Sequence, residues 1–152
     1  MQTTLIILKP DAVQRGLMGR IISRFEEKGF QIVGGKFMRI SEELAGRHYA
    51  EHRERPFYRS LVGFMTSCPV LVLAVRGKNA VDVARKLMGK TAGYESDPGT
   101  IRGDFGLSRS FNLIHGSDSA EAAERELKLF FTPDELHEYD RNICGWITDS
   151  DE

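Results

Sequence analysis

Apolar residues along the chain fall into two kinds of block. Residues 4–8, 31–40 and 70–75 are short, mostly apolar runs with the length expected of buried strands. Between these runs, apolar side chains recur every three or four residues, which is the spacing of an amphipathic helix. These helical stretches begin near Ile21, Ser41, Pro56 and Asn79. The alternation of the two patterns predicts an α/β fold with helices packed on a sheet.

Individual residues suggest where several of these elements begin and end. Gly29 is expected to end the first helix, because glycine adopts the left-handed conformation that closes many helices. Ser41 is expected to cap a helix that continues to about His52, and Asn79 is expected to cap another. The pair Gly34-Gly35 predicts a bulge or a close backbone approach within the second strand.

Residues 90–110 show no periodicity and are predicted to form a long, functional loop. A short strand is expected to follow and to reach His115, and a helix is expected over residues 120–131. The order of elements repeats a strand–helix–strand unit. It predicts one domain over residues 1–152, a two-layer ferredoxin-like sandwich in which helices cover a four-stranded antiparallel sheet.

Composition narrows the class of protein. The chain has 41% hydrophobic and 28% charged residues and a formal net charge of −1, so bulk charge indicates neither a nucleic-acid partner nor a membrane partner. Cys68 and Cys144 lack the spacing of metal ligands and are expected to be free thiols in a reducing compartment. The apolar run at residues 5–8 is too short for a signal peptide or a membrane span. We expect a cytoplasmic location.

The sequence Asn-Leu-Ile-His-Gly-Ser-Asp-Ser at residues 112–119 contains the clearest candidate chemistry. It would deliver His115 from a strand into a tight turn that a helix follows. Glu126 lies about 60° from the apolar face of that helix, at roughly 100° per residue, so its carboxylate could reach back towards His115. A histidine, a carboxylate that orients it and nearby hydroxyls are the minimal parts of a nucleophile site. A half-buried histidine with a structural role is the simpler alternative.

Two other motifs are less convincing. Residues 84–91 fit a relaxed phosphate-loop pattern, but the residues before Gly89 are themselves helical and no helix follows. His48 and His52, with Glu51 between them, fit an inverted zinc-peptidase pattern. That pattern lacks a third ligand and is flanked by arginines, so a solvated polar helix face is the simpler interpretation.

Three scattered cations change the balance in favour of function. Lys9 follows the first strand, Arg85 lies on the polar side of a helix, and Arg102 lies in the long loop. Each alone is more typical of a surface charge, and we expect all three to be at least partly exposed. Together with His115, they could bind the anionic groups of a polyphosphate.

The blocks at residues 8–16, 98–105 and 112–119, with a shorter one at residues 55–57, resemble those of nucleoside diphosphate kinases. The resemblance extends over essentially the whole chain. It implies an enzyme that moves the γ-phosphoryl group from a nucleoside triphosphate, such as ATP, to a nucleoside diphosphate. The family reaction proceeds by a ping-pong mechanism through a phosphohistidine intermediate.

The resemblance also implies roles for individual residues. His115 would be the nucleophile, Glu126 would hold its other ring nitrogen, and Ser117 would support Glu126. Phe57 would stack on the base. The residues that would contact phosphates and sugar are Lys9, which is also catalytic, Tyr49, Arg85, Thr91, Arg102 and Asn112. Mg²⁺ would be held mainly by the nucleotide phosphates, with no direct protein ligand.

The resemblance further implies a homo-oligomer, with a hexamer favoured over a tetramer because the chain continues through Trp146. No membrane and no obligatory nucleic acid are implied. Two rival functions remain, a catalytically silent binding module on the same fold and a histidine phosphocarrier that passes phosphate to a protein in signalling. The complete set of expected site residues argues against the first, and the nucleotide contacts argue against the second.

The sequence departs from the usual family pattern in two places. Ala92-Gly93 replaces an asparagine–proline pair, which is expected to loosen the long loop. Phe111 replaces an arginine, and Arg109 occupies the place of a small aliphatic residue near the base. If residues 107–111 belong to the strand that leads to His115, Arg109 could either point into solvent or lie flat on the base opposite Phe57.

Overall fold

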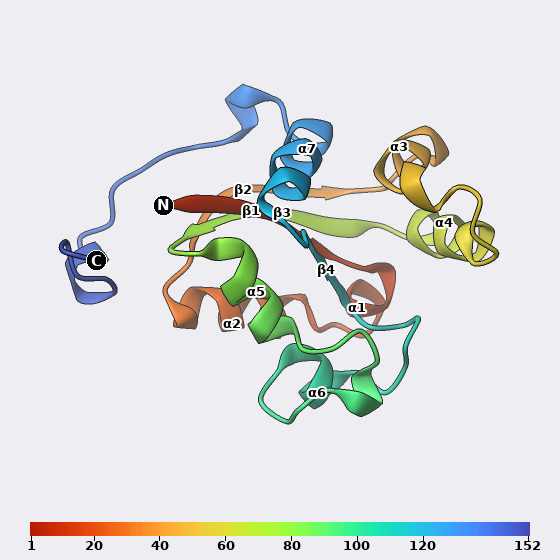
Figure 1. The fold of residues 1–152 in the computed structure, drawn as a ribbon, viewed down its shortest axis with the longest axis horizontal. Coiled ribbons are helices and arrows are strands. Elements are labelled where there is room, and N and C mark those ends of the chain that lie inside the picture. Colours follow the sequence, from red (N-terminus) through yellow and green to blue (C-terminus); the bar gives the residue numbers. More distant parts are fainter.

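The computed structural model describes residues 1–152 and has one antiparallel sheet at its centre (Figure 1). Its strands lie in the order β2-β3-β1-β4. They are β1 (Gln2–Leu8), β2 (Gln31–Met38), β3 (Val70–Gly77) and β4 (Ile114–Gly116). Every neighbouring pair is antiparallel, as predicted. The first strand of the chain is therefore an interior strand, hydrogen-bonded on both sides.

Two helices make the predicted strand–helix–strand connections. Helix α2 (Met18–Lys28) joins β1 to β2, and α5 (Ala80–Met88) joins β3 to β4. Both pack on the same face of the sheet (Figure 1). The second face is covered by α3 (Glu42–His48), α4 (Tyr58–Ser67) and α7 (Ala120–Phe130). The ferredoxin-like arrangement is thus extended by a further helical layer.

The residues of β1 explain why both faces are covered. Leu5 and Ile7 point into the core beneath α3, α4 and α7, whereas Ile6 and Leu8 point into the core beneath α2 and α5. All four side chains are completely buried. A strand with two buried faces needs no alternating polar residues, which accounts for the continuous apolar run.

Several predicted boundaries are confirmed and others are wrong. Gly29 ends α2 with φ of 105°, and the Ser41 hydroxyl accepts a hydrogen bond from the Leu44 amide at the start of α3. Helix α3 ends at His48, however, and a short 3-10 turn follows it. Asn79 precedes α5 as expected, but it adopts φ of 49° and its side chain makes no capping hydrogen bond. The predicted bulge is present, because the register of β2 shifts between Ile32 and Gly34.

Two short helices were not predicted. Helix α1 (Pro10–Gln14) follows β1 directly, and α6 (Ile101–Phe105) lies inside the expected loop, where the Thr100 hydroxyl caps it. Five residues are too few to show a helical period, so their sequences gave no signal. Because β4 begins only at Ile114, residues 107–111 are not in a strand, and the alternation argument for Arg109 is wrong. Arg109 is exposed.

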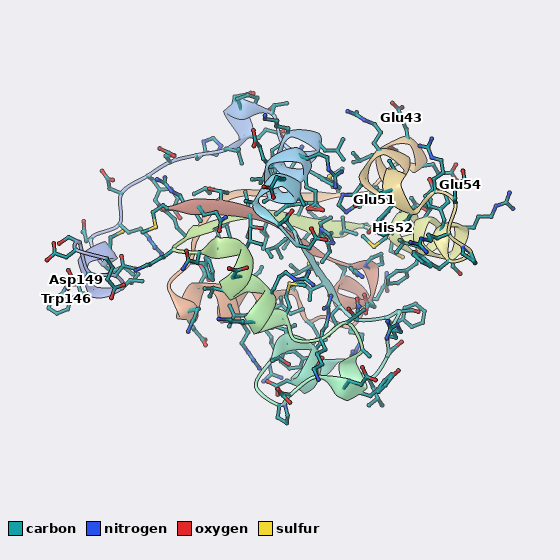
Figure 2. The ribbon with its side chains drawn as sticks, in the orientation of Figure 1. Glu43, Glu51, His52, Glu54, Trp146 and Asp149 are labelled. Carbon is teal, nitrogen blue, oxygen red and sulfur yellow. The ribbon has the colours of Figure 1, made fainter.

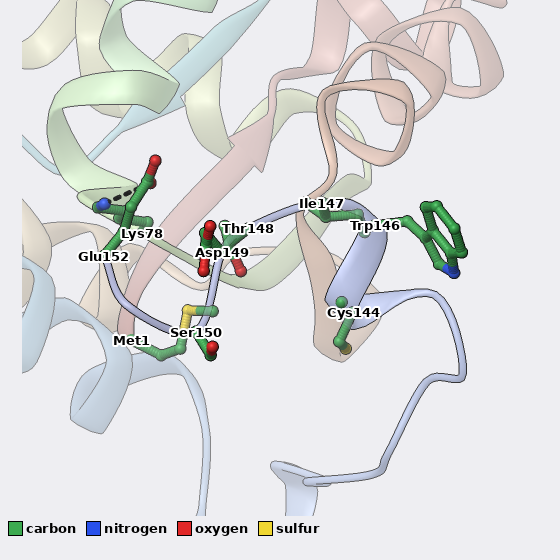
Figure 3. A pocket seen from close by; sticks show the side chains of 10 residues that line it. Met1, Lys78, Cys144, Trp146, Ile147, Thr148, Asp149, Ser150 and Glu152 are labelled. Atoms are coloured by element: carbon green, nitrogen blue, oxygen red, sulfur yellow. Dashed lines mark hydrogen bonds and ion pairs between the residues drawn. The ribbon is translucent and has the colours of Figure 1, made fainter.

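The residues after α7 cross back over the molecule as a C-terminal strap, residues 131–152 (Figure 1). Its Arg141 guanidinium donates hydrogen bonds to the carbonyls of Gly29 and Phe30. A cavity of about 760 Å³ lies between this strap and Met1, and an ion pair of 2.7 Å between Lys78 and Glu152 lies beside it (Figure 3). No helix has the length and apolar character needed to span a membrane.

Candidate active site

The nucleophile candidate and its carboxylate come from β4 and α7. In β4, Ile114 belongs to the core beneath α5, so the alternation of the strand turns His115 to the opposite face, towards α7. The Ser119 hydroxyl caps α7 by accepting a hydrogen bond from the Ala122 amide. Glu126, 3% exposed, then lies with its Oε1 atom 2.8 Å from His115 Nε2.

The second oxygen of Glu126 is also bound. Ser117, 1% exposed, donates its hydroxyl to Glu126 Oε2 over 2.6 Å. Burial raises the pKa of Glu126, but the hydrogen bonds from His115 and Ser117 outweigh that effect and leave the pKa below its usual value. The carboxylate is therefore charged at neutral pH and can only accept. His115 must carry its proton on Nε2, which leaves the lone pair on Nδ1 free to react.

A strained turn precedes β4. Leu113 has φ of 73°, and the amide of residue 114 donates to the Asn112 carbonyl over 2.8 Å, which closes a γ-turn around Leu113. The turn is held in place by Asp11 from α1, whose Oδ2 accepts from the Leu113 amide over 3.0 Å. Leu113 is completely buried. The conformation that aims His115 is thus maintained by packing and by contacts distant in sequence.

Lys9 and Asn112 connect the end of β1 to this turn. Lys9 Nζ donates to Asn112 Oδ1 over 2.7 Å, and Asn112 Nδ2 donates to the Thr91 carbonyl over 2.9 Å. Lys9 is only 8% exposed. Burial, reinforced by the charge of Arg102, lowers the pKa of Lys9 from 10.5 to about 8. Lys9 is still mostly protonated at neutral pH.

Arg102 was expected to be partly exposed, but it is buried. The same expectation was wrong for Lys9. The guanidinium of Arg102 donates to the backbone carbonyls of Asn112 and Ile114 over 3.1 and 2.6 Å. It also donates to those of Gly89 and Lys90 over 3.2 and 3.4 Å. The cause is α6, which places Arg102 beneath the loop. Four of its five N–H groups are committed to the backbone, and one remains free.

These groups surround a cavity of about 290 Å³. Eight expected site residues line it: Lys9, Tyr49, Arg85, Thr91, Arg102, Asn112, His115 and Glu126. Arg85 lies at its edge and donates to the Gly116 carbonyl over 3.2 Å. Ser117 lies behind Glu126, and Phe57 lies outside the lining, 49% exposed and 5.4 Å from the His52 ring. Although the cavity at the strap is larger, only this one contains a histidine bonded to a carboxylate.

The lining also includes residues for which no role was predicted. Asp118 and Arg125 contribute a carboxylate and a guanidinium. Their only sequence signal was position, since Asp118 lies inside the block around His115 and Arg125 directly precedes Glu126. Glu51 and His52 line the cavity from the corner between α3 and α4, at the opposite end of the molecule from Trp146 (Figure 2).

The zinc-peptidase pattern is not assembled. His48 is 4% exposed, so the expectation of a solvated polar face was wrong for it. His52 belongs to no group of three potential metal ligands. Helix α3 ends at His48, which removes the continuous helical spacing that the pattern requires.

Comparison with known proteins gives a consistent result. The family model described as nucleoside diphosphate kinase matches residues 2–136. The nucleoside diphosphate kinase of Bacillus cereus is 52% identical over 147 residues, 97% of this chain and 99% of the relative. That of Oceanobacillus iheyensis is 53% identical with the same coverage.

Solved structures agree in fold and sequence. A halophilic nucleoside diphosphate kinase from Halobacterium salinarum, solved with CDP, superposes with a TM-score of 0.95 at 51% identity, over 97% of this chain and 99% of the other. A family protein from Babesia bovis also gives 0.95, at 44% identity over 97% and 100% of the two chains. The chain therefore belongs to the nucleoside diphosphate kinase family, phosphotransferases that move a phosphoryl group from a nucleoside triphosphate to a nucleoside diphosphate.

Proposed function

We propose that His115 is the nucleophile of this phosphoryl transfer. Its Nδ1 attacks the γ-phosphorus of the donor, a nitrogen–phosphorus bond forms, and the bridging oxygen leaves with the donor diphosphate. In the second half-reaction, the terminal oxygen of an acceptor diphosphate attacks the phosphohistidine and restores His115. The observation that carries this proposal is the 2.8 Å contact between His115 Nε2 and Glu126 at the edge of a cation-lined cavity.

Glu126 and Ser117 have supporting roles in this scheme. Attack through Nδ1 places positive charge on the imidazole ring, and Glu126 stabilises that charge through the proton that stays on Nε2. Ser117 fixes the second oxygen of Glu126, so the carboxylate cannot rotate away from the ring. No proton has to be transferred during the step.

The positively charged lining binds the polyphosphate. Lys9 and Arg85 offer charge to the transferring oxygens, and Arg102 contributes its charge and its one free N–H group. Tyr49, Thr91 and Asn112 complete the proposed contacts to phosphate and sugar. The base would lie outside the cavity against Phe57, whose exposed ring has a face available for stacking and no hydrogen-bond code to select one base.

Kinases of this family use a divalent cation, and we propose that it is Mg²⁺. The residues present fit an ion held mainly by substrate. Glu126 is occupied by His115 and Ser117, which leaves Asp118 and Glu51 as the other carboxylates of the lining. Mg²⁺ usually keeps several waters and is bound through few carboxylates together with phosphates. When bound, it neutralises phosphate charge during transfer.

We propose further that residues 1–152 act as one cytoplasmic domain within a homo-oligomer, with a hexamer favoured. Two exposed apolar side chains support association. Phe37, on the edge strand β2, is 60% exposed, and Trp146 in the C-terminal strap is 91% exposed. A large apolar side chain exposed on an edge strand favours contact with another chain. The free thiols of Cys68 and Cys144 support a reducing compartment.

The direct test follows phosphate from ATP through the protein. Protein incubated with γ-labelled ATP, Mg²⁺ and no acceptor should take up acid-labile, alkali-stable label. Adding an unlabelled nucleoside diphosphate should transfer that label to the corresponding triphosphate. Turnover without a labelled protein intermediate would contradict the two-step scheme.

Replacing Glu126 by glutamine is expected to slow phosphorylation of His115 while leaving nucleotide affinity nearly unchanged. The amide is close in shape but neutral, so it stabilises the charged ring less well. Single-turnover labelling measures the chemical step, and equilibrium binding of a diphosphate measures affinity. Weaker nucleotide binding with an unchanged rate of His115 phosphorylation would contradict the proposed role of Glu126.

The pKa of Lys9 near 8 predicts opposite effects of pH on catalysis and on folding. Catalytic efficiency, kcat/KM, should decline as pH rises through about 8, because the free enzyme then loses a cation from its phosphate site. Folding stability should rise between pH 8 and 10.5, because the unfolded chain there binds the Lys9 proton more tightly than the native state. The Lys9→Arg variant is the control, since arginine stays charged. The same alkaline decline in both proteins would rule out Lys9 as its source.

A further inference from the structure

His48 is a buried histidine that the proposed reaction does not use. It is the last residue of α3 and is 4% exposed. Its ring packs against the rings of Tyr49, His115 and Phe130, with centroids 4.4, 4.8 and 5.2 Å away. Neither ring nitrogen has a hydrogen-bond partner. Buried polar atoms are almost always paired, so two unpaired nitrogens in one ring call for an explanation.

One of these nitrogens faces the nucleophile and its carboxylate. His48 Nδ1 lies 3.7 Å from Glu126 Oε1, which is too long for a hydrogen bond. The same oxygen is 2.8 Å from His115 Nε2. One ligand atom from each of the three residues lies within 4.8 Å of the others, and no other group of three potential metal ligands occurs in the chain.

We propose that His48, His115 and Glu126 form a site for Zn²⁺ or a similar transition-metal ion, and that its occupation switches off the nucleophile. Two imidazoles and one carboxylate are a ligand set that zinc uses in hydrolytic enzymes. Imidazole nitrogen favours zinc, copper and nickel, whereas Mg²⁺ favours oxygen. The site is therefore chemically distinct from that of the cation that accompanies the nucleotide.

The required movements are small. Zinc bonds of 2.0–2.2 Å in a tetrahedron place ligand atoms about 3.3–3.5 Å apart. The contact between His115 and Glu126 must therefore open slightly, and His48 must move towards them. Ser117 can continue to hold Glu126 Oε2, which provides the outer support that metal ligands usually have. The His115 side chain is 22% exposed towards the cavity, so an ion can enter and a water can take the fourth position.

The protonation state of His48 favours metal binding at this site, whereas the neighbouring positive charges oppose it. Burial lowers the pKa of His48 to about 3, so no proton has to be displaced from it at neutral pH. Glu126 is the only charged ligand, and four cations of the lining repel a dication, namely Lys9, Arg85, Arg102 and Arg125. The charge of a single carboxylate does not compensate for all four. We therefore expect reversible binding rather than a permanent structural metal.

Occupation of this site would disable His115. Zinc takes the lone pair of Nε2, the proton that Nε2 carried passes through solvent to Nδ1, and the ring loses its hydrogen bond to Glu126. With its proton on Nδ1, the neutral zinc-bound ring has no lone pair left to attack the γ-phosphorus. Glu126 can no longer stabilise the charge that develops during attack. This consequence rests on the proposed role of His115, whereas metal binding itself does not.

The binding test uses Co²⁺ as a spectroscopic substitute for zinc in nucleotide-free protein. Cys68 and Cys144 are first changed to serine, because thiols also bind these metals. Intense visible absorption of tetrahedral cobalt is expected, and Zn²⁺ should abolish it. Loss of an outer-sphere partner weakens metal binding by about 10–100-fold, and loss of a direct ligand should weaken it at least as much. His48→Phe is therefore expected to weaken cobalt binding by at least that factor, whereas the control His52→Phe should not weaken it. Equal cobalt affinity in His48→Phe and the parent would overturn the site.

The switching test compares labelling by γ-labelled ATP before and after zinc loading, with free zinc removed before ATP is added. The loaded parent should lose most of its labelling rate and regain it with a chelator. His48→Phe and the polar variant His48→Gln, checked for folding by circular dichroism, should each keep nearly the same rate with and without zinc. Full labelling of a zinc-loaded parent would overturn the switch. A parent that takes no label even without zinc would contradict the role of His115 and leave the cobalt result standing.

Discussion

The His115→Ala variant is expected to lose both the acid-labile label and turnover, by roughly 10⁴–10⁶-fold, the scale on which removal of an enzyme nucleophile acts. Alanine has no lone pair to accept the phosphoryl group, and the cations of the cavity cannot replace it. The folded state should persist, because His115 is partly exposed and its ring makes one hydrogen bond. Label uptake and thermal unfolding measured on the same preparation test both statements.

His137→Ala is the matched control for this prediction. His137 lies after α7 in the C-terminal strap and does not line the cavity. The control should label and turn over like the parent. Label that persists in His115→Ala would sink the assignment and would direct attention to another of the four histidines.

The Arg102→Ala variant is expected to lose both stability and activity. Truncation leaves four backbone carbonyls without their donor, at about 1–3 kcal/mol for each group that water cannot reach, and a total of about 2–4 kcal/mol is expected after partial hydration. The melting temperature should fall by roughly 5–12 °C at this chain length. Turnover should fall by about 10²–10³, because a preorganised cation is lost and the loop that carries Thr91 is released.

Arg85 offers a contrast that separates the two roles. It is exposed and makes one hydrogen bond, to the Gly116 carbonyl. Arg85→Ala should therefore lower turnover on a similar scale with little change in melting temperature. Arg102→Lys should keep the charge but not the planar set of donors, so it should recover only part of the stability. Unchanged stability in Arg102→Ala would show that its bonds to the backbone contribute little.

The parts of the fold that sequence predicted are those with a long enough pattern. The strand at residues 4–8, the helix that ends at Gly29 and the helix that Ser41 caps all have a periodic run and a residue that marks a boundary. Helices α1 and α6 have a residue that marks a boundary, Pro10 in α1 and Thr100 before α6, but no periodic run, because five residues complete little more than one turn. The error over Arg102 follows directly, since a residue assigned to a loop was assumed to be exposed.

The candidate site divides in the same way. Glu126 could be related to His115 because both lie in one strand–helix unit, and helical geometry fixes the direction of the carboxylate. The pairing of Lys9 with Asn112 spans 103 residues and depends on the strand order. No local pattern reports that order. The sequence pattern paired His48 with His52, whereas the fold places the His48 ring against that of His115.

The interior position of β1 has a consequence for synthesis of the chain. Residues 2–8 leave the ribosome before their hydrogen-bonding partners, which are residues 71–77 and 114–116. Until those segments emerge, a strand with the apolar run of residues 5–8 has two unpaired edges and no sheet to join, which is the condition that favours aggregation and chaperone binding. Lys9 likewise has no Asn112 to meet until most of the chain has been made. The phosphate site therefore forms late, and a truncated nascent chain cannot contain a partly working version of it.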